Sequence, residues 1–305
     1  MGVVCAKDKK KRYEDLKRAQ SLGLEDRSIH LRQFHFGAEV KNLKDLRVSS
    51  SNFVVEKKGD IKAEYNLLLP ELGKGSYGKV QKALHKLSNL KRAVKIIEKR
   101  RTTKDYLNRL VNEVNILKGC DHPNIIKIME FFQDEFNFYI VTELCEGGEL
   151  YKRIKQKVKF TEQEAACTIK QVVSALYYIH NHKIVHRDLK PENILYDSRQ
   201  DDSLIKVIDF GTSHHYDPSS KMTQKFGTCY YIAPEVLKGQ YDESCDVWSC
   251  GVILYLLLGG YPPFFGSSDE VVLKKVEKGV VEFDAENWDD VSSKKPFFGK
   301  GLAVF

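Results

Sequence analysis

The stretch His186-Arg187-Asp188-Leu189-Lys190-Pro191-Glu192-Asn193 constrains this chain more than any other. It places an acid, a lysine and an amide at fixed offsets between two apolar segments. Asp188 can accept a proton from a hydroxyl, Lys190 can neutralise a transferring phosphoryl group, and Asn193 can hold Mg²⁺ through its side-chain oxygen. A polar surface turn carries the same residue types, and a lone His-Arg-Asp favours that interpretation.

Two further motifs in the right order make a chance match the weaker hypothesis. Asp209-Phe210-Gly211 follows a short apolar segment, and Ala233-Pro234-Glu235 comes after it. Together the three motifs resemble the catalytic loop and its downstream partners in serine/threonine protein kinases. The resemblance implies that Asp188, Lys190 and Asn193 are catalytic, that Asn193 and Asp209 hold the metal, and that Thr228 bridges Asp188 and Lys190.

A glycine-rich segment upstream has two competing interpretations. The pattern G-x-G-x-x-G occurs at residues 73–78, and it marks either a dinucleotide-binding turn that opens a helix or a strand-turn-strand lid over nucleotide phosphates. Residues 78–83 read as a strand, which favours the lid. Lys95 follows within a strand, and Glu113 lies on the apolar-striped helix expected over residues 104–118. The resemblance makes Lys95 the lysine that grips the ATP phosphates and Glu113 its ion-pair partner.

The resemblance also implies the remaining ATP contacts. Strands are expected over residues 126–132 and 137–142, and they end at a hinge whose backbone would bind adenine, with Thr142 in the gatekeeper place. The expected ATP-binding residues are Leu72, Gly73, Lys74, Gly75, Ser76, Tyr77, Gly78, Val80, Ala93, Lys95, Glu113, Thr142, Glu143 and Cys145. ATP and Mg²⁺ are thus the expected cofactors.

The expected fold is α+β with two lobes, a small antiparallel β lobe and a large, mainly helical lobe that lacks its C-terminal helices. Residues 1–50 form a lipidated basic arm and flexible linker, 51–145 the small lobe with a lead-in hairpin, 146–293 the incomplete large lobe, and 294–305 a divergent tail. The hairpin is expected to pair residues 53–56 with 61–65. The capping box Thr161-Glu162-Gln163-Glu164 predicts the start of a long helix.

Composition limits the other classes of function. The 305 residues are 42% apolar and carry a net charge of +7, and residues 1–20 alone hold seven Lys or Arg against three Asp or Glu. This clustering at one end suits an anionic surface better than a nucleic-acid interface, so no nucleic acid is expected. Seven cysteines without a C-x-x-C pair fit reduced thiols in the cytoplasm. No apolar run is long enough to span a bilayer.

The N-terminus carries the signals of a lipid anchor. Removal of Met1 would expose Gly2 for myristoylation, Cys5 is placed for palmitoylation, and a run of basic residues follows. Ala6 departs from the preferred Ser or Thr, and an ordinary disordered start is the alternative. A single myristoyl chain binds a membrane only marginally, whereas a second chain or a polybasic patch stabilises the attachment. We therefore expect a peripheral protein on the inner face of a membrane.

Within the kinases, the Met-Gly-x-x-Cys start and the stretch around Ala233-Pro234-Glu235 resemble the calcium-dependent, calmodulin-type enzymes. No EF-hand loop pattern occurs, so a calcium sensor domain or calmodulin is a possible partner that these residues do not encode. Glu149 matches the acid that binds arginine three residues before the phosphoacceptor, which implies protein substrates with basic residues before Ser or Thr. Leu256 replaces the acid that some relatives use for arginine at minus two.

The end of the chain favours a rival function. The resemblance implies an arginine partner for Glu235, but the last arginine in the sequence is Arg199. We therefore expect a marginally stable domain with weak activity, truncated relative to the family. The rival is a catalytically impaired, membrane-tethered scaffold or nucleotide-binding protein.

Overall fold

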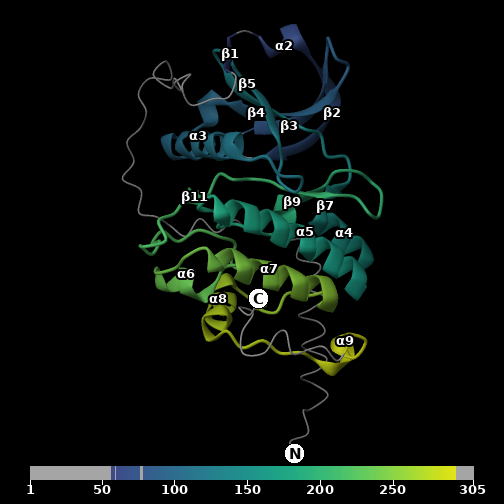
Figure 1. Ribbon diagram of the computed structural model, residues 1–305, viewed down its shortest axis with the longest axis vertical. Helices are drawn as coiled ribbons and strands as arrows, with labels where there is room; N and C mark the ends of the chain where they lie inside the picture. The colour runs from purple at the N-terminus through teal and green to yellow at the C-terminus, as the bar shows by residue number, and fades with distance from the viewer. Residues whose placement is uncertain (1–55, 59, 76–77, 293–305) are drawn as a thin grey trace, which may run out of the picture.

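The computed structural model describes residues 56–58, 60–75 and 78–292 and divides them into two lobes (Figure 1). The small lobe holds a six-stranded sheet of order β1-β5-β6-β4-β3-β2. Its strands are β1 (Glu56–Lys58), β2 (Tyr65–Gly75), β3 (Gly78–His85), β4 (Lys91–Glu98), β5 (Ile128–Gln133) and β6 (Asn137–Thr142). Its helices are α2 (Ile61–Glu64), the 3₁₀ turn η3 (Lys99–Arg101) and α3 (Lys104–Gly119). The predicted α+β, two-lobed architecture is confirmed.

The small-lobe sheet has an apolar cluster on each face. Consecutive residues Ile96 and Ile97 of β4 belong to different clusters, as do Phe132 and Phe131 of β5. This follows from the two-residue period of a strand, which points neighbouring side chains to opposite faces. One cluster includes Leu110 and Val114 of α3, so α3 covers that face. The arrangement attaches α3 to the sheet through a small apolar patch.

The hairpin predicted from residues 53–56 and 61–65 is wrong where the structure describes it. Residues Ile61–Glu64 form the helix α2, whose start is capped by the Asp60 side chain accepting from the Lys62 amide at 2.9 Å. The strand β1 instead pairs in parallel with β5. An ion pair supports this pairing, because the Lys57 ammonium group of β1 contacts the Glu130 carboxylate of β5 at 2.7 Å.

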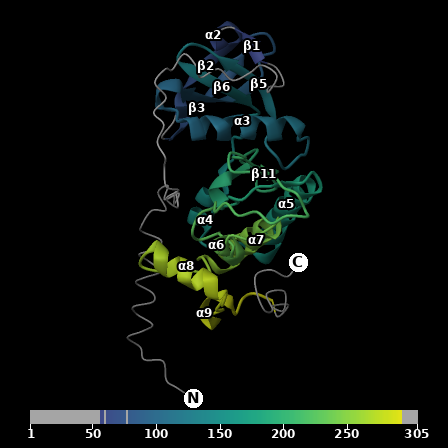
Figure 2. The same ribbon diagram turned by 90° about the vertical axis from the view of Figure 1, so that its left-hand side faces the viewer.

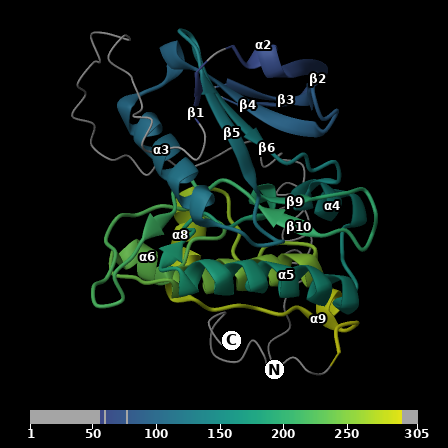
Figure 3. The same ribbon diagram turned by 45° about the horizontal axis from the view of Figure 1, so that its top comes forward.

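The large lobe is built around two long helices, α5 (Glu162–Asn181) and α7 (Ser244–Gly259), both labelled in Figure 1, and Figure 3 shows α5 along its length. The predicted capping box is confirmed, with Thr161 accepting from the Glu164 amide and Glu164 accepting from the Thr161 amide. Helix α7 is apolar on nearly every side and is buried throughout most of its length, as expected for a helix without a polar face. The other helices are α4 (Leu150–Lys157), η4 (Pro191–Asn193), α6 (Pro234–Lys238), α8 (Asp269–Lys278) and α9 (Ala285–Trp288).

Short strands of the large lobe lie below the small-lobe sheet, between it and α5 and α7 (Figures 1 and 2). They are β7 (Gly148–Glu149), β8 (Ile184–Val185), β9 (Ile194–Tyr196), β10 (Ile205–Val207) and β11 (His214–His215). The motif residues follow β8 and β10 directly in the chain. The functional side chains are therefore held at the face of the large lobe that looks toward the small lobe.

Candidate active site

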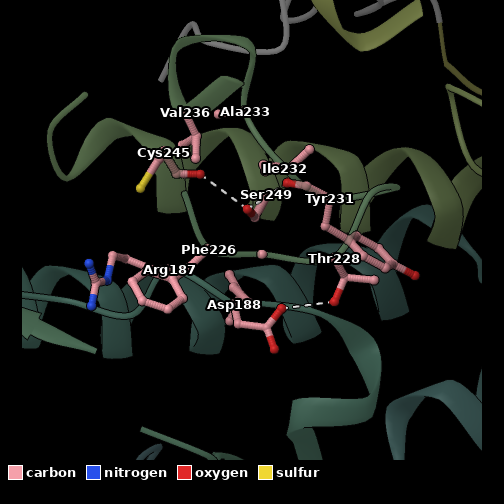
Figure 4. A pocket seen from close by; sticks show the side chains of 12 residues that line it. Arg187, Asp188, Phe226, Thr228, Tyr231, Ile232, Ala233, Val236, Cys245 and Ser249 are labelled. Atoms are coloured by element: carbon pink, nitrogen blue, oxygen red, sulfur yellow. Dashed lines mark hydrogen bonds between the residues drawn. The ribbon is translucent and has the colours of Figure 1, made fainter. Parts of the chain in front are cut away.

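Four predicted catalytic side chains form one hydrogen-bonded cluster. The Thr228 hydroxyl donates to Asp188 Oδ1 at 2.9 Å, and Lys190 Nζ lies 3.1 Å from both Thr228 Oγ1 and Asp188 Oδ2. The Asn193 amide donates to the Asp188 backbone carbonyl at 2.9 Å. Thr228 therefore bridges Asp188 and Lys190, as the sequence predicted. Figure 4 shows Asp188 and Thr228 pointing toward each other.

The ion pair within this cluster keeps Lys190 charged. Burial is the largest influence and would lower the pKa of Lys190, but the carboxylates of Asp188, Glu192 and Asp209 together raise it above its usual range. A charged ammonium beside Asp188 is the arrangement that can neutralise a phosphoryl group during transfer. The cluster thus combines a proton acceptor with a fixed positive charge.

A buried carboxylate holds the backbone of the catalytic loop. Asp246 of α7 has no exposed surface and accepts the amides of His186 and Arg187, each at 2.8 Å. The His180 ring contacts the same carboxylate at 2.9 Å. Burial would raise the pKa of Asp246, but the hydrogen bonds, led by that of His180, hold it below its usual range. This loop is therefore anchored by charge-assisted hydrogen bonds in a place that water does not reach.

Asp209 lies at the end of the segment that follows β10. Its φ of +63° puts it in the left-handed region. Burial and the carboxylates of Glu113 and Asp188 are the larger influences on the pKa values of Lys95 and Lys190, and the negative charge of Asp209 adds to the rise at both. Asp209 is therefore near both lysines. The next residue, Phe210, is fully buried and packs edge-on against the His186 ring at 4.9 Å between centroids. This packing fixes the direction in which Asp209 leaves the core.

Asn193 and Asp209 have the donor chemistry that Mg²⁺ prefers. The Asn193 Nδ2 group is used by the Asp188 carbonyl, which leaves the amide oxygen for a metal. Magnesium is commonly held by one or two protein oxygens together with phosphate oxygens and water. The donor set of this pair fits that requirement.

Lys95 of β4 and Glu113 of α3 form an ion pair across the small lobe. Lys95 Nζ lies 3.0 Å from Glu113 Oε2 and 3.3 Å from Oε1. Burial is the largest influence and would lower the pKa of Lys95, but Glu113, together with Tyr106 and Asp209, raises it above its usual range. The predicted pair is thus formed, and it joins α3 to the sheet beside Asp209.

The glycine-rich segment is the predicted strand-turn-strand. Residues Leu72, Gly73, Lys74 and Gly75 lie on β2 and Gly78 and Val80 on β3, while Ser76 and Tyr77 lie outside the described residues. A β-carbon at Gly78 would stand 1.9 Å from the Ile96 carbonyl oxygen. Only glycine fits there. Because Gly78–His85 form a strand and not the start of a helix, the dinucleotide-binding interpretation is excluded. Val80 pairs in register with Lys95, which brings this turn beside the lysine.

The hinge follows β6, as predicted. Ala93 of β4 pairs in register with Thr142, and the Glu143 carboxylate is held by Lys206 at 2.9 Å. Within the described part of the chain, no hydrogen bond uses the amide or carbonyl of Cys145. These backbone groups are the kind that adenine recognition needs. Burial raises the pKa of the Cys145 thiol to about 12, so this cysteine stays protonated.

A second acid near the predicted substrate residue Glu149 was missed by the sequence reasoning. Glu149 lies on β7 and contacts Lys152 at 3.2 Å. The Glu192 carboxylate lies close enough for Glu149 to raise its pKa, although burial is the larger cause. Its Oε2 atom is buried and has no hydrogen-bond partner among the described residues. The only signal in the sequence was its place inside the catalytic-loop motif.

Three sequence expectations concern the ends of the chain. Gly2, Cys5 and the tail from residue 294 lie outside the described residues.

Glu235 is half-buried and accepts a hydrogen bond from Ser244 Oγ at 3.5 Å, and no ion pair to it occurs within residues 78–292. The expectation of weak stability remains a prediction. None of the helices that the structure describes is long and apolar enough to cross a bilayer.

Comparisons with known proteins agree with this geometry. The protein kinase domain model matches residues 67–302. Calcium-dependent protein kinase 3 of Plasmodium yoelii yoelii is 43% identical over 255 residues, which cover 83% of this chain and 47% of that protein. Calcium-dependent protein kinase 5 of Plasmodium falciparum (isolate 3D7) is 50% identical over 222 residues, covering 73% and 39%. The chain thus spans less than half the length of these relatives. The chain belongs to the protein kinase domain family.

Proposed function

We propose that this chain transfers the γ-phosphoryl group of ATP to serine or threonine hydroxyls of protein substrates. The observation that carries the proposal is the cluster of Asp188, Lys190 and Thr228, whose side chains lie within hydrogen-bond distance of one another. Lys190 two residues after Asp188, together with Thr228, is the pattern of serine/threonine rather than tyrosine kinases.

Each side chain has a distinct part in this reaction. Asp188 orients the substrate hydroxyl and accepts its proton, while Lys190 stabilises negative charge on the transferring group. Lys95, held by Glu113, binds the phosphates of ATP. Asn193 and Asp209 would hold Mg²⁺, which would supply positive charge to neutralise the phosphates. Phosphoryl transfer depends mainly on such positioning and charge stabilisation, and little on covalent chemistry.

We further propose that the substrate carries arginine three residues before the phosphoacceptor. Glu149 and Glu192 supply two nearby carboxylates, and the buried Glu192 oxygen without a partner supports recognition of a cation there. A guanidinium group suits two carboxylates because it presents several donors in a plane. Position 256, where some relatives carry an acid for arginine at minus two, is a buried leucine that is 6% exposed. An arginine at minus two therefore meets no acid at that position.

The rival function is a membrane-tethered scaffold without catalysis. The formed Lys95–Glu113 pair and the complete Asp188 cluster favour an enzyme. An assay with ATP, Mg²⁺ and a serine peptide bearing arginine at minus three separates the two functions. We expect phosphopeptide, detected by mass spectrometry. ATP binding without phosphopeptide would support the scaffold.

We also propose that the N-terminal arm attaches the kinase to the cytoplasmic face of a membrane. The support is the sequence of Gly2, Cys5 and the basic run that follows. Gly2→Ala and Cys5→Ser should each shift the protein toward the soluble fraction, and the double variant most. Unchanged fractionation of the double variant would contradict the proposal. Calcium dependence, which the relatives' names state, would require a calcium sensor domain or calmodulin acting on the kinase.

A further inference from the structure

An aromatic ring contacts two arginines at the junction of the lobes. The centre of the Phe226 ring is 4.4 Å from Cζ of Arg187 and 5.7 Å from Cζ of Arg109. Figure 4 shows the ring beside the Arg187 guanidinium. Both distances are within the range of favourable cation–π contacts. All three side chains are half-buried, which limits screening by water.

The three residues belong to three different parts of the active site. Arg109 is on α3, Arg187 is in the catalytic loop, and Phe226 is in the segment that leads to Thr228. Arg109 and Glu113 are four residues apart on α3, so they lie on the same face of the helix. A contact that holds Arg109 therefore also holds the face that presents Glu113 to Lys95.

Hydrogen bonds around the ring join the same parts. Arg187 Nε donates to the Thr212 carbonyl at 2.6 Å, and the Asn112 side chain of α3 donates to the Ser213 carbonyl at 2.7 Å. These bonds connect the catalytic loop and α3 to the start of the segment that follows Phe210. The Phe226 ring connects both of them to the end of that segment.

The same segment positions Thr228. Phe226 precedes Thr228 by two residues, and the Tyr241 hydroxyl donates to the Gln224 carbonyl at 2.5 Å. The segment packs closely on the large lobe, with a cavity of only about 10 Å³ among Arg187, Phe226, Thr228 and Ser249. Such a space admits roughly one water molecule. A shift of Phe226 would therefore move Thr228 and its bond to Asp188.

We propose that Phe226 is a positioning residue, an aromatic clamp that holds Arg109 and Arg187 together and so orders the active site without a phosphate on this segment. The side chains of Thr223 and Gln224, at the place where other kinases carry the acceptor of an activating phosphate, are exposed. Arg187 is the residue that would bind such a phosphate; its Nε group already donates to the Thr212 carbonyl, and its guanidinium lies over the Phe226 ring. The clamp rests on the proposed phosphoryl transfer for its effect on rate.

The test compares Phe226→Leu with Phe226→Tyr in the full 305-residue chain, after intact-mass analysis has shown that the protein carries no phosphate. Loss of two cation–π contacts should lower kcat about tenfold. The KM values for ATP and peptide should stay within roughly twofold, because Phe226 is placed to hold α3 and Thr228 and not to bind substrates. Phe226→Tyr keeps the ring and should retain wild-type kcat. Phe136→Leu, at an exposed aromatic on the β5–β6 turn, is the matched control.

A double-mutant cycle of Phe226→Leu with Arg109→Met should show non-additive losses, because both changes remove the same contact. Additive losses, equal losses in Phe226→Leu and Phe226→Tyr, or unchanged kcat in Phe226→Leu would overturn the clamp.

Hydrogen exchange measured without ATP separates the clamp from the proposed activity. Phe226→Leu should speed exchange in residues 104–119 and 211–228, while Phe226→Tyr and Phe136→Leu should not. If the wild-type chain transfers no phosphate, the proposed function fails, yet this exchange difference still supports the clamp. Unchanged exchange in Phe226→Leu would contradict the clamp even in an active enzyme.

Discussion

The two lobes hold their parts of the active site in different ways. In the large lobe, the carboxylate of Asp246 is completely buried and fixes two consecutive amides of the catalytic loop. In the small lobe, Glu113 holds Lys95 through one ion pair, and the Lys95 side chain is 34% exposed. Asp188, the proposed proton acceptor, is therefore preorganised by the core, whereas Lys95, which we propose binds phosphate, depends on where α3 lies.

This difference separates stability from activity. A change at Asp246 affects a buried network and should lower both, because uncompensated buried polar groups are costly. A change at the Lys95–Glu113 pair affects a contact between β4 and α3 that is partly exposed at the lysine and buried at the glutamate, and it should lower activity more than stability. The following variants test that separation.

Lys95→Met should have the largest effect among the small-lobe variants. Removing the charge that binds the phosphates should lower peptide phosphorylation by at least two to three orders of magnitude. The thermal melting temperature should change little, because Lys95 is placed to act on phosphates and contributes a partly exposed side chain to the fold. Peptide phosphorylation and circular dichroism melts measure the two effects. A variant that is unfolded, or one that is fully active, would break the proposed division between the lobes.

Asp246→Asn should lower stability and activity together. Replacing one carboxylate oxygen with an amide leaves a loop N–H facing another donor and removes the charge beside His180, at a cost of about 3 kcal/mol. For a domain of this size that corresponds to a fall in melting temperature of roughly 6–12 °C. Because the native pKa of Asp246 is depressed, its contribution to stability is complete at neutral pH and is lost as the pH falls through the acid range. The wild type should therefore lose more stability on acidification than Asp246→Asn.

Glu113→Gln is the matched control for Asp246→Asn, since it also removes one carboxylate charge. It should reduce activity about tenfold or more through misplacement of Lys95, while the melting temperature falls by less than in Asp246→Asn. Equal losses of stability in the two variants would show that the small-lobe joint is as deeply fixed as the catalytic loop.

Glu149→Ala should have a smaller effect that is confined to the substrate. We expect the KM for a peptide with arginine at minus three to rise about tenfold, which is the loss of roughly one charge-assisted hydrogen bond. The KM for ATP and the melting temperature should not change. A peptide array should show wild-type preference for arginine at minus three over minus two. The reverse preference would remove the role assigned to Glu149.

The features that the sequence predicted correctly are those coded by local patterns. Helix α3 follows from its apolar stripe, the start of α5 from the Thr161–Glu164 capping box, and strand β6 from its apolar run. Asp188, Lys190 and Asn193 were identifiable because they lie within one eight-residue motif, whereas Thr228 was assigned through the resemblance to protein kinases. Their hydrogen bonds agree with that interpretation.

The missed features depend on contacts between distant residues. Strand β1 pairs with β5, more than seventy residues away, so the polar turn before Asp60 was misread as a hairpin. Glu192 becomes notable only because its Oε2 atom is buried without a hydrogen-bond partner among the described residues. The importance of Phe226 depends on Arg109 and Arg187 both reaching its ring. No spacing rule in one sequence contains those distances.

The central claim is that Asp188 of this chain catalyses phosphoryl transfer to a protein hydroxyl. The most direct measurement is a single-turnover assay of wild type and Asp188→Ala, with γ-labelled ATP and a serine peptide bearing arginine at minus three. ATP binding is measured in parallel by calorimetry. We predict labelled phosphoserine with the wild type, a rate lower by about three orders of magnitude in Asp188→Ala, and similar ATP affinity in both. Comparable transfer rates in the two proteins, or no transfer by a wild type that binds ATP, would contradict the account.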